Sequence, residues 1–140
     1  MKYSTQQLKN IKYLPKTVTA ITFLLLLLVF LFLFLGRKEP ALRPGLILIY
    51  LPDFYQHASN LCISYFIFST VGYVWLLMGI KISNIIVFGA VILLANFIYE
   101  LWIPFLNTRD IIDAYYGCAG VIVAFIFLLL VKRFGLNLKK

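Results

Sequence analysis

TVTAITFLLLLLVFLFLFL, the stretch from Thr17 to Leu35, contains no charged residue and consists only of leucine, phenylalanine and valine from Phe23 onward. As an α-helix it would extend roughly 28 Å at about 1.5 Å per residue, close to the ~30 Å hydrocarbon layer of a bilayer. Backbone N–H and C=O groups inside lipid must be hydrogen-bonded within their own segment. The stretch therefore predicts a membrane-spanning helix.

The rest of the chain is of similar character. Of the 140 residues, 63% are apolar, and the mean hydropathy is +0.96, which is too high for a soluble domain of this length. Neither Leu24–Leu28 nor Phe125–Val131 alternates apolar with polar residues, as the strands of a transmembrane barrel would. We therefore expect an all-α integral membrane protein, a four-transmembrane-helix bundle. The expected spans are Thr17–Leu35, His57–Ile80, Ile85–Ile103 and Asp113–Val131.

These spans form one membrane domain over residues 17–131, preceded by a cytoplasmic amphipathic segment at 1–16 and followed by a basic cytoplasmic tail at 132–140. Ser4–Leu14 is expected to be a short interfacial helix, because Ser4-x-x-Gln7 has the form of a capping box. The first span is expected to remain as an uncleaved anchor. Its apolar core exceeds the roughly 7–15 residues of a signal peptide, and no A-x-A cleavage site follows it.

The charged residues indicate the topology. All five acidic residues and only four basic ones lie on one side of the predicted membrane. The other nine basic residues lie on the opposite side, which the positive-inside rule assigns to the cytoplasm. We therefore expect both termini in the cytoplasm, and we read the +8 net charge as a topology signal rather than a sign of nucleic-acid binding. The cytoplasmic nine are Lys2, Lys9, Lys12, Lys16, Lys81, Lys132, Arg133, Lys139 and Lys140.

The connections differ in length. Gly36–Gln56 contains a six-residue apolar run, Leu46–Leu51, which is too short to span and is expected to lie in the outer interface over the mouth of the bundle. The turn Lys81–Asn84 is tight, so the second and third spans should form an antiparallel hairpin. Loop Pro104–Ile112 is also short, which makes the third and fourth spans neighbours.

Polar and small residues recur at helical spacing on three of the spans, whereas the first span is apolar all round. Such stripes predict that the second, third and fourth spans form the packed core around a polar site, with the first span peripheral. The stripes are Asp53, His57, Asn60 and Ser64 on the second span, Asn96 and Glu100 on the third, and Asp113, Gly117, Gly120 and Ala124 on the fourth.

Several of these residues also have purely structural interpretations. Asp53 and Asp110 could cap the second and fourth spans, Asp113 could lie in the first turn of the fourth, and His57 could simply be bonded to Asp53. Asn60 and Asn96 could join helices through their amides. Cys62 and Cys118 are expected to be buried thiols rather than a disulfide.

Glu100 is the strongest functional candidate. It ends a continuous apolar helix beside Trp102, where the helix dipole disfavours an anion, so it should pair with Arg109 or be partly protonated. Catalytic candidates are Glu100, Asp113 and His57. The sequence has no cofactor-binding motif and no Cys or His pair at the spacing of a zinc site, so we expect neither a cofactor nor a metal. Asp53, His57, Glu100 and Asp113 could nevertheless hold a divalent cation. The expected binding set is Asp53, His57, Asn60, Asn96, Glu100, Arg109, Asp110 and Asp113.

The same residues carry a resemblance to a known family. Asp53-x-x-x-His57, Glu100, Arg109-x-x-x-Asp113 and Gly120 resemble the pattern of VanZ-like membrane proteins, over about residues 52–131. The chain departs from that pattern at three positions: it has Phe54 where the family has Lys, Ile103 where the family has Gln, and Gly117 where the family has Asn. The resemblance implies a bacterial envelope protein of the inner membrane, in a family whose founding member is linked to teicoplanin resistance.

Three functions are open. The first is a non-enzymatic protein that binds or shields a lipid headgroup, a cell-wall precursor or a glycopeptide antibiotic at its outer mouth, and interfacial tyrosines such as Tyr50 and Tyr55 favour it. The second is an enzyme acting on a lipid-linked substrate, with Glu100 and Asp113 as acid and base and His57 assisting. The third is a small proton-coupled transporter or a subunit of one. Membrane lipids and a membrane protein are the other expected partners.

Overall fold

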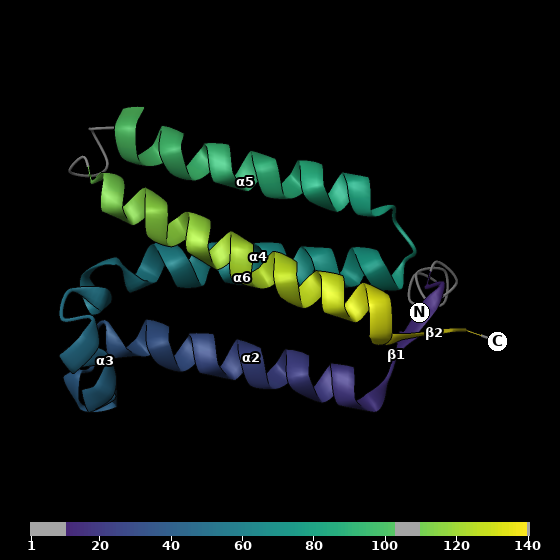
Figure 1. Cartoon of the computed structure of the whole chain (residues 1–140), viewed down its shortest axis with the longest axis horizontal. Helices are drawn as coiled ribbons and strands as arrows, with labels where there is room; N and C mark the ends of the chain where they lie inside the picture. Colours follow the sequence, from purple (N-terminus) through teal and green to yellow (C-terminus); the bar gives the residue numbers. More distant parts are fainter. Residues whose placement is uncertain (1–10, 103–109, 140) are drawn as a thin grey trace, which may run out of the picture.

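The computed structural model describes residues 11–102 and 110–139, and four long helices dominate it (Figure 1). Each is long and apolar enough to cross a membrane, which confirms the expected four helices. Their ends differ by a few residues from the expected spans; the second begins three residues earlier, so that His57 lies inside it rather than at its start. The helices are α2 (Thr17–Gly36), α4 (Phe54–Leu77), α5 (Ile82–Trp102) and α6 (Ile111–Phe134).

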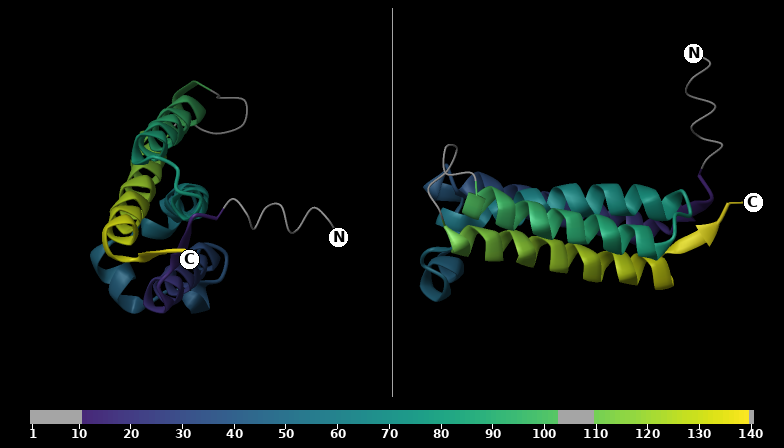
Figure 2. Two further views of the ribbon diagram at one scale, coloured as in Figure 1. Left: turned by 90° about the vertical axis from the view of Figure 1, so that its right-hand side faces the viewer. Right: turned by 90° about the horizontal axis from the view of Figure 1, so that it is seen from above.

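The centre of the bundle is the pair α4 and α6, with α2 and α5 on opposite sides of it (Figures 1 and 2). Within the apolar stretch of each helix, 44% of the residues are buried in α4 and in α6, against 6% in α2 and 11% in α5. The expectation that α2 is peripheral is confirmed. The expectation that α5 packs with α4 and α6 is confirmed for one face of α5: Ile85 is buried in the hydrophobic core, and Phe88 and Leu93 pack against it. The opposite face of α5 is exposed, as at Val87 and Leu94. In lipid such side chains need no protein neighbour, so hydropathy could not reveal this.

Glycines let the two central helices approach closely. A Cβ built on Gly120 would collide with the Leu61 carbonyl oxygen and would lie 3.1 Å from the Tyr65 backbone nitrogen. One built on Gly72 would collide with the Leu128 side chain. Within the small stripe of the fourth span, Gly120 thus faces α4, whereas a Cβ on Gly117 would collide with the Asn96 side chain of α5.

Stacked aromatic rings attach α2 to the centre. The ring of Phe30 stacks on Tyr65 with centroids 3.6 Å apart, and Phe23 stacks on Tyr73 at 4.2 Å. Phe23 also lies 5.9 Å from the Phe127 ring of α6. The side chains that attach α2 to the centre are therefore mainly aromatic rings.

One end of the bundle is closed by a small clasp. Strand β1 (Tyr13–Pro15) pairs antiparallel with β2 (Leu136–Leu138), and the Lys12 N–H donates to the Leu77 carbonyl at 2.9 Å. The expected helix over Ser4–Leu14 therefore does not extend through residues 11–14, and its earlier part lies outside the described residues. A residue that precedes proline disfavours the helical region, which accounts for extended backbone at Leu14 before Pro15.

Between α2 and α4 the chain forms a 3-10 turn (Pro40–Leu42) and the short helix α3 (Gly45–Tyr50). The Arg43 guanidinium donates to the carbonyls of Gly36 and Arg37 at 2.7 and 2.9 Å, so it satisfies the free end of α2. It also lies 5.0 Å from the Tyr55 ring. The side chains of α3 are largely exposed, which fits the expected position of Leu46–Leu51 at a membrane surface.

The remaining expectations concern the hairpin and the cysteines. Helix α4 ends at Leu77 and α5 starts at Ile82, so the hairpin is confirmed, and Gly79 takes the left-handed φ of +77° that this tight turn requires. Cys62 is buried and Cys118 is partly buried, and both are free thiols, as expected.

Candidate functional site

The acidic end of the bundle, where α4 and α6 begin, joins His57 to two aspartates of another helix. His57 Nδ1 lies 2.8 Å from Asp113 Oδ1 and 3.5 Å from Asp110 Oδ2. An ionised carboxylate only accepts, so the imidazole donates its Nδ1 proton to Asp113. The His57 side chain is largely buried, whereas Asp110 remains partly open to solvent. The result is an oriented imidazole at the mouth of the α4/α6 contact.

The structure places these aspartates where helix chemistry favours them. Asp110 is the N-cap of α6, and its Oδ1 accepts from the Ile112 N–H at 2.8 Å. Asp113 lies in the first turn, near the positive end of the helix dipole. Both structural interpretations are confirmed, and both residues still face His57. Capping and site formation are therefore not alternatives here.

Asp53 is not the partner of His57, which corrects one interpretation. Its side chain is exposed, makes no capping bond to the backbone, and accepts from the Gln56 amide at 3.1 Å. The contact of His57 is with another helix: Asp113 of α6 reaches it, and α6 approaches α4 closely at Gly120. Helical spacing along one chain segment could not show this.

Deeper in the bundle, two polar pairs join α4 to α5. The Asn60 amide donates to Glu100 Oε1 at 3.1 Å, and Glu100 is only 2% exposed. Ser64 and Asn96 exchange hydrogen bonds of 3.2 and 3.0 Å. The expectation that the two asparagines bond across helices is confirmed; such bonds contribute about 0.6 kcal/mol each in membrane proteins. The stripes on the second and third spans do converge.

Arg109 lies outside the described residues, so the expected Arg109–Glu100 pair remains a prediction. Near the site, Arg37, just after α2, donates to the Ser59 hydroxyl of α4, a contact that the sequence did not indicate. Ser59 lies one residue off the polar stripe of α4 and so gave no signal. Arg37 is one of the four basic residues on the acidic side, and its hydrogen bond to Ser59 joins the end of α2 to α4 beside the site.

A pocket of about 240 Å³ opens beside His57, between the α3–α4 connection and the start of α6. Its polar lining residues are Asp53, His57, Tyr50 and Tyr116. Tyr116 forms one wall, with its ring centroid 5.2 Å from that of His57. Glu100 is not among the residues that line it. The full lining is Tyr50, Leu51, Pro52, Asp53, Phe54, His57, Ile112 and Tyr116.

The cluster also has the donors for a metal ion. One ligand atom from each of His57, Asp110 and Asp113 lies within 4.8 Å of the others. This differs from the expected cation set, because Asp110 takes the place of Asp53 and Glu100. Nitrogen and carboxylate oxygen donors suit zinc and other transition metals. Without an ion, His57 already forms a hydrogen bond with Asp113, and Asp110 accepts from the Ile112 N–H.

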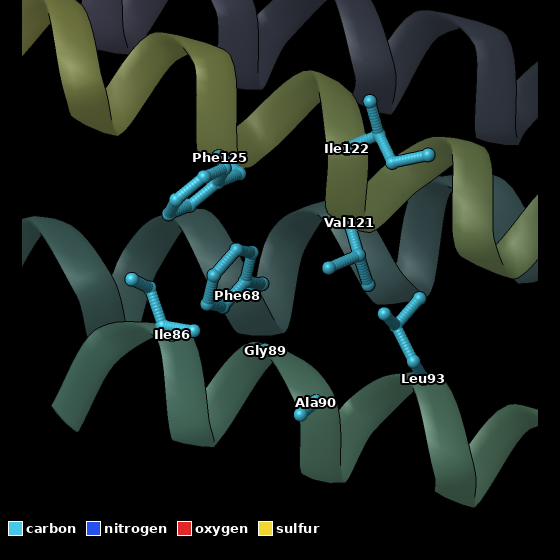
Figure 3. Close-up of a pocket in the computed structure, with 8 residues that line it drawn as sticks. All are labelled: Phe68, Ile86, Gly89, Ala90, Leu93, Val121, Ile122 and Phe125. Carbon is cyan, nitrogen blue, oxygen red and sulfur yellow. The ribbon is translucent and has the colours of Figure 1, made fainter. Parts of the chain in front are cut away.

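An apolar cavity of about 230 Å³ lies one helical turn further from the acidic end (Figure 3). Phe68 of α4, Leu93 of α5 and Val121 of α6 line it, each three to four residues beyond Ser64, Asn96 and Gly117. The cavity has no polar lining residue. The polar contacts between α4 and α5 thus stop at Ser64 and Asn96 and give way to a hydrocarbon-like space.

Comparison of the chain with protein-family models, curated proteins and solved structures finds no match. The resemblance to VanZ-like proteins therefore rests on its residues alone. Of those, the structure describes Asp53, His57, Glu100, Asp113 and Gly120. His57 and Asp113 are in contact, and Glu100 of α5 and Gly120 of α6 are both buried in the bundle.

Proposed function

We propose that this protein is a VanZ-like multi-pass protein of the bacterial inner membrane that binds an envelope lipid or lipid-linked cell-wall precursor by its polar headgroup. The acidic end faces outward, and both termini face the cytoplasm. The observation that carries the proposal is the pocket beside His57, whose imidazole is oriented by Asp113 and whose rim carries Asp53. These groups favour a ligand with ammonium or hydroxyl donors.

The apolar cavity of Figure 3 supports a lipid-linked ligand over a free glycopeptide. It is lined by α4, α5 and α6, of which α4 and α6 also line the pocket beside His57, and its apolar lining suits a hydrocarbon chain. An amphiphile could place its head at the acidic end and its chain alongside α5. A glycopeptide antibiotic would use the outer pocket without the cavity.

Native mass spectrometry of the detergent-purified protein tests the proposal. We expect a retained lipid or cell-wall intermediate, identified by its mass. Asp53→Asn removes one charge from the rim without touching the helix contacts, and it should reduce retention at least about tenfold, because a charge-assisted hydrogen bond contributes about 1.5–3 kcal/mol. Glu39→Gln is the matched control, since Glu39 is exposed and does not line the pocket. A protein that purifies without ligand, or equal retention in both variants, contradicts the proposal.

The topology gives a separate prediction. A reporter domain fused at Lys81, in the turn between α4 and α5, should report the cytoplasm, and fusions at Leu42 should report the outside. The charge difference between the two sides carries this expectation. An alkaline-phosphatase and a fluorescent-protein reporter at both positions measure it. Phosphatase activity from the Lys81 fusion would place the acidic end in the cytoplasm and overturn the outward orientation.

An enzyme is the second candidate, and the His57–Asp113 contact favours it. An imidazole held by a carboxylate through Nδ1 can use its other nitrogen as a general base. In this arrangement His57 acts as the base and Asp113 orients it. Incubation with envelope lipids should then give a product of changed mass, absent with His57→Gln. Lipids that return unchanged from prolonged incubation favour the binding function.

A further inference from the structure

The basic end of the bundle, where α2 and α5 begin and α4 and α6 end, carries charge of one sign. Within the described residues of this end, 11–16, 77–82 and 132–139, six residues are Lys or Arg and none is acidic. Such a surface attracts anionic phosphate groups. The basic residues are Lys12, Lys16, Lys81, Lys132, Arg133 and Lys139.

A pocket of about 280 Å³ opens at this end between the start of α2 and the end of α6. Lys16 lies at its polar edge, followed along α2 by Thr19 and Thr22. Leu130 and Phe134 of α6 are among its apolar lining residues. The pocket therefore has a cationic and hydroxyl-bearing side next to a hydrocarbon wall.

The clasp of β1 and β2 fixes this arrangement. The Lys16 N–H donates to the Gly135 carbonyl at 2.8 Å, which holds the start of α2 against the end of α6. A Cβ on Gly135 would lie 2.7 Å from the Thr19 hydroxyl oxygen, so glycine leaves room for that side chain. The Lys16 ammonium is exposed and has neither an ion pair nor a hydrogen bond among the described residues. It is available to a ligand.

We propose that this pocket binds an anionic phospholipid. Lys16 and Thr19 contact the phosphodiester, and the acyl chain lies along Leu130 and Phe134. A lipid matches the site better than a soluble phosphate, because phosphate alone leaves the apolar wall in contact with water. Lys16 supplies the positive charge at the pocket, and the Thr19 hydroxyl adds a directional hydrogen bond. This site is at the opposite end from the headgroup pocket and is independent of it.

Titration of the delipidated protein with dioleoyl phosphatidylglycerol or dioleoyl phosphatidylcholine, read by native mass spectrometry, tests the site. We expect about tenfold tighter binding of phosphatidylglycerol at the first bound lipid. Lys16→Gln should weaken that binding about fivefold. Lys81→Gln, which removes an exposed lysine from the same end but outside the pocket, should leave it within twofold. Equal loss in the two variants would mean a diffuse charge effect and overturn the proposal.

A second pair of variants tests the hydroxyl. Thr19→Val keeps the shape of the side chain and removes its donor, so phosphatidylglycerol binding should fall severalfold. Thr17→Val makes the same change at an exposed position outside the pocket and should have no effect. Unchanged thermal unfolding midpoints in phosphatidylcholine confirm that the variants are folded. Displacement of the lipid by inorganic phosphate would indicate a free-phosphate site instead, and equal binding of both lipids would indicate adventitious contact only.

Discussion

Gly120→Leu is expected to prevent α4 and α6 from packing and to give a protein that does not purify as a monodisperse species. A leucine there would drive its Cβ into the Leu61 carbonyl, and backbone in the middle of a helix cannot move aside as a side chain can. Over-packing of ordinary cores costs about 1–3 kcal/mol, and a backbone collision at the central interface should exceed that range. Size-exclusion chromatography in detergent and the thermal unfolding midpoint measure the effect.

Gly45 provides a matched control. It begins α3, it is exposed, and a Cβ added there would have no atom within 4 Å. Gly45→Leu should therefore purify like the native protein and unfold within a few degrees of it. If Gly120→Leu also unfolded at the native midpoint, the close approach of α4 and α6 would not be what holds the bundle together.

The four spans could be predicted from the sequence because a bilayer imposes length and hydropathy on each helix separately. The arrangement of the helices depends on information that these patterns do not contain. Helix α5 carries Asn96 and Glu100, which suggested a central helix, and those two residues do bond to α4, but the opposite face of α5 is exposed. The polar stripe correctly identified the face of α5 that contacts α4, but it did not indicate how much of the helix is buried.

The candidate site shows the same limit. Stripes predicted that polar groups of α4, α5 and α6 meet, and Asn60, Glu100, Ser64 and Asn96 do so. They could not give the relative register of α4 and α6, which decides that His57 meets Asp113 and not Asp53. The β1–β2 clasp was not foreseen, because strands of three residues show no alternation and pair across more than 120 positions of the sequence.

Removal of the Glu100 and Asp113 side chains should destabilise the bundle by about 1–3 kcal/mol at each position, because a buried partner is left unsatisfied. Glu100→Ala takes away the acceptor of the Asn60 amide, and Asp113→Ala takes away the acceptor of the largely buried His57 ring. The amide variants Glu100→Gln and Asp113→Asn keep an oxygen in place and should lose much less stability. Thermal unfolding of the four single variants measures this difference.

The same amide variants separate a structural cluster from a functional one. Glu100→Gln and Asp113→Asn together replace two carboxyl groups near the pocket with amides, which preserves the shape and keeps an acceptor oxygen at each position. If the site recognises a headgroup with donor groups, the double variant should fold, yet retain at least about tenfold less ligand. The reason is that Asp113 no longer orients the His57 imidazole that lines the pocket, and a loss of about 1.4 kcal/mol is tenfold. A double variant that unfolds at the native midpoint and still carries its ligand at the native level would mean that these carboxylates only join the helices. Recognition would then rest on Asp53 and the aromatic wall of the pocket.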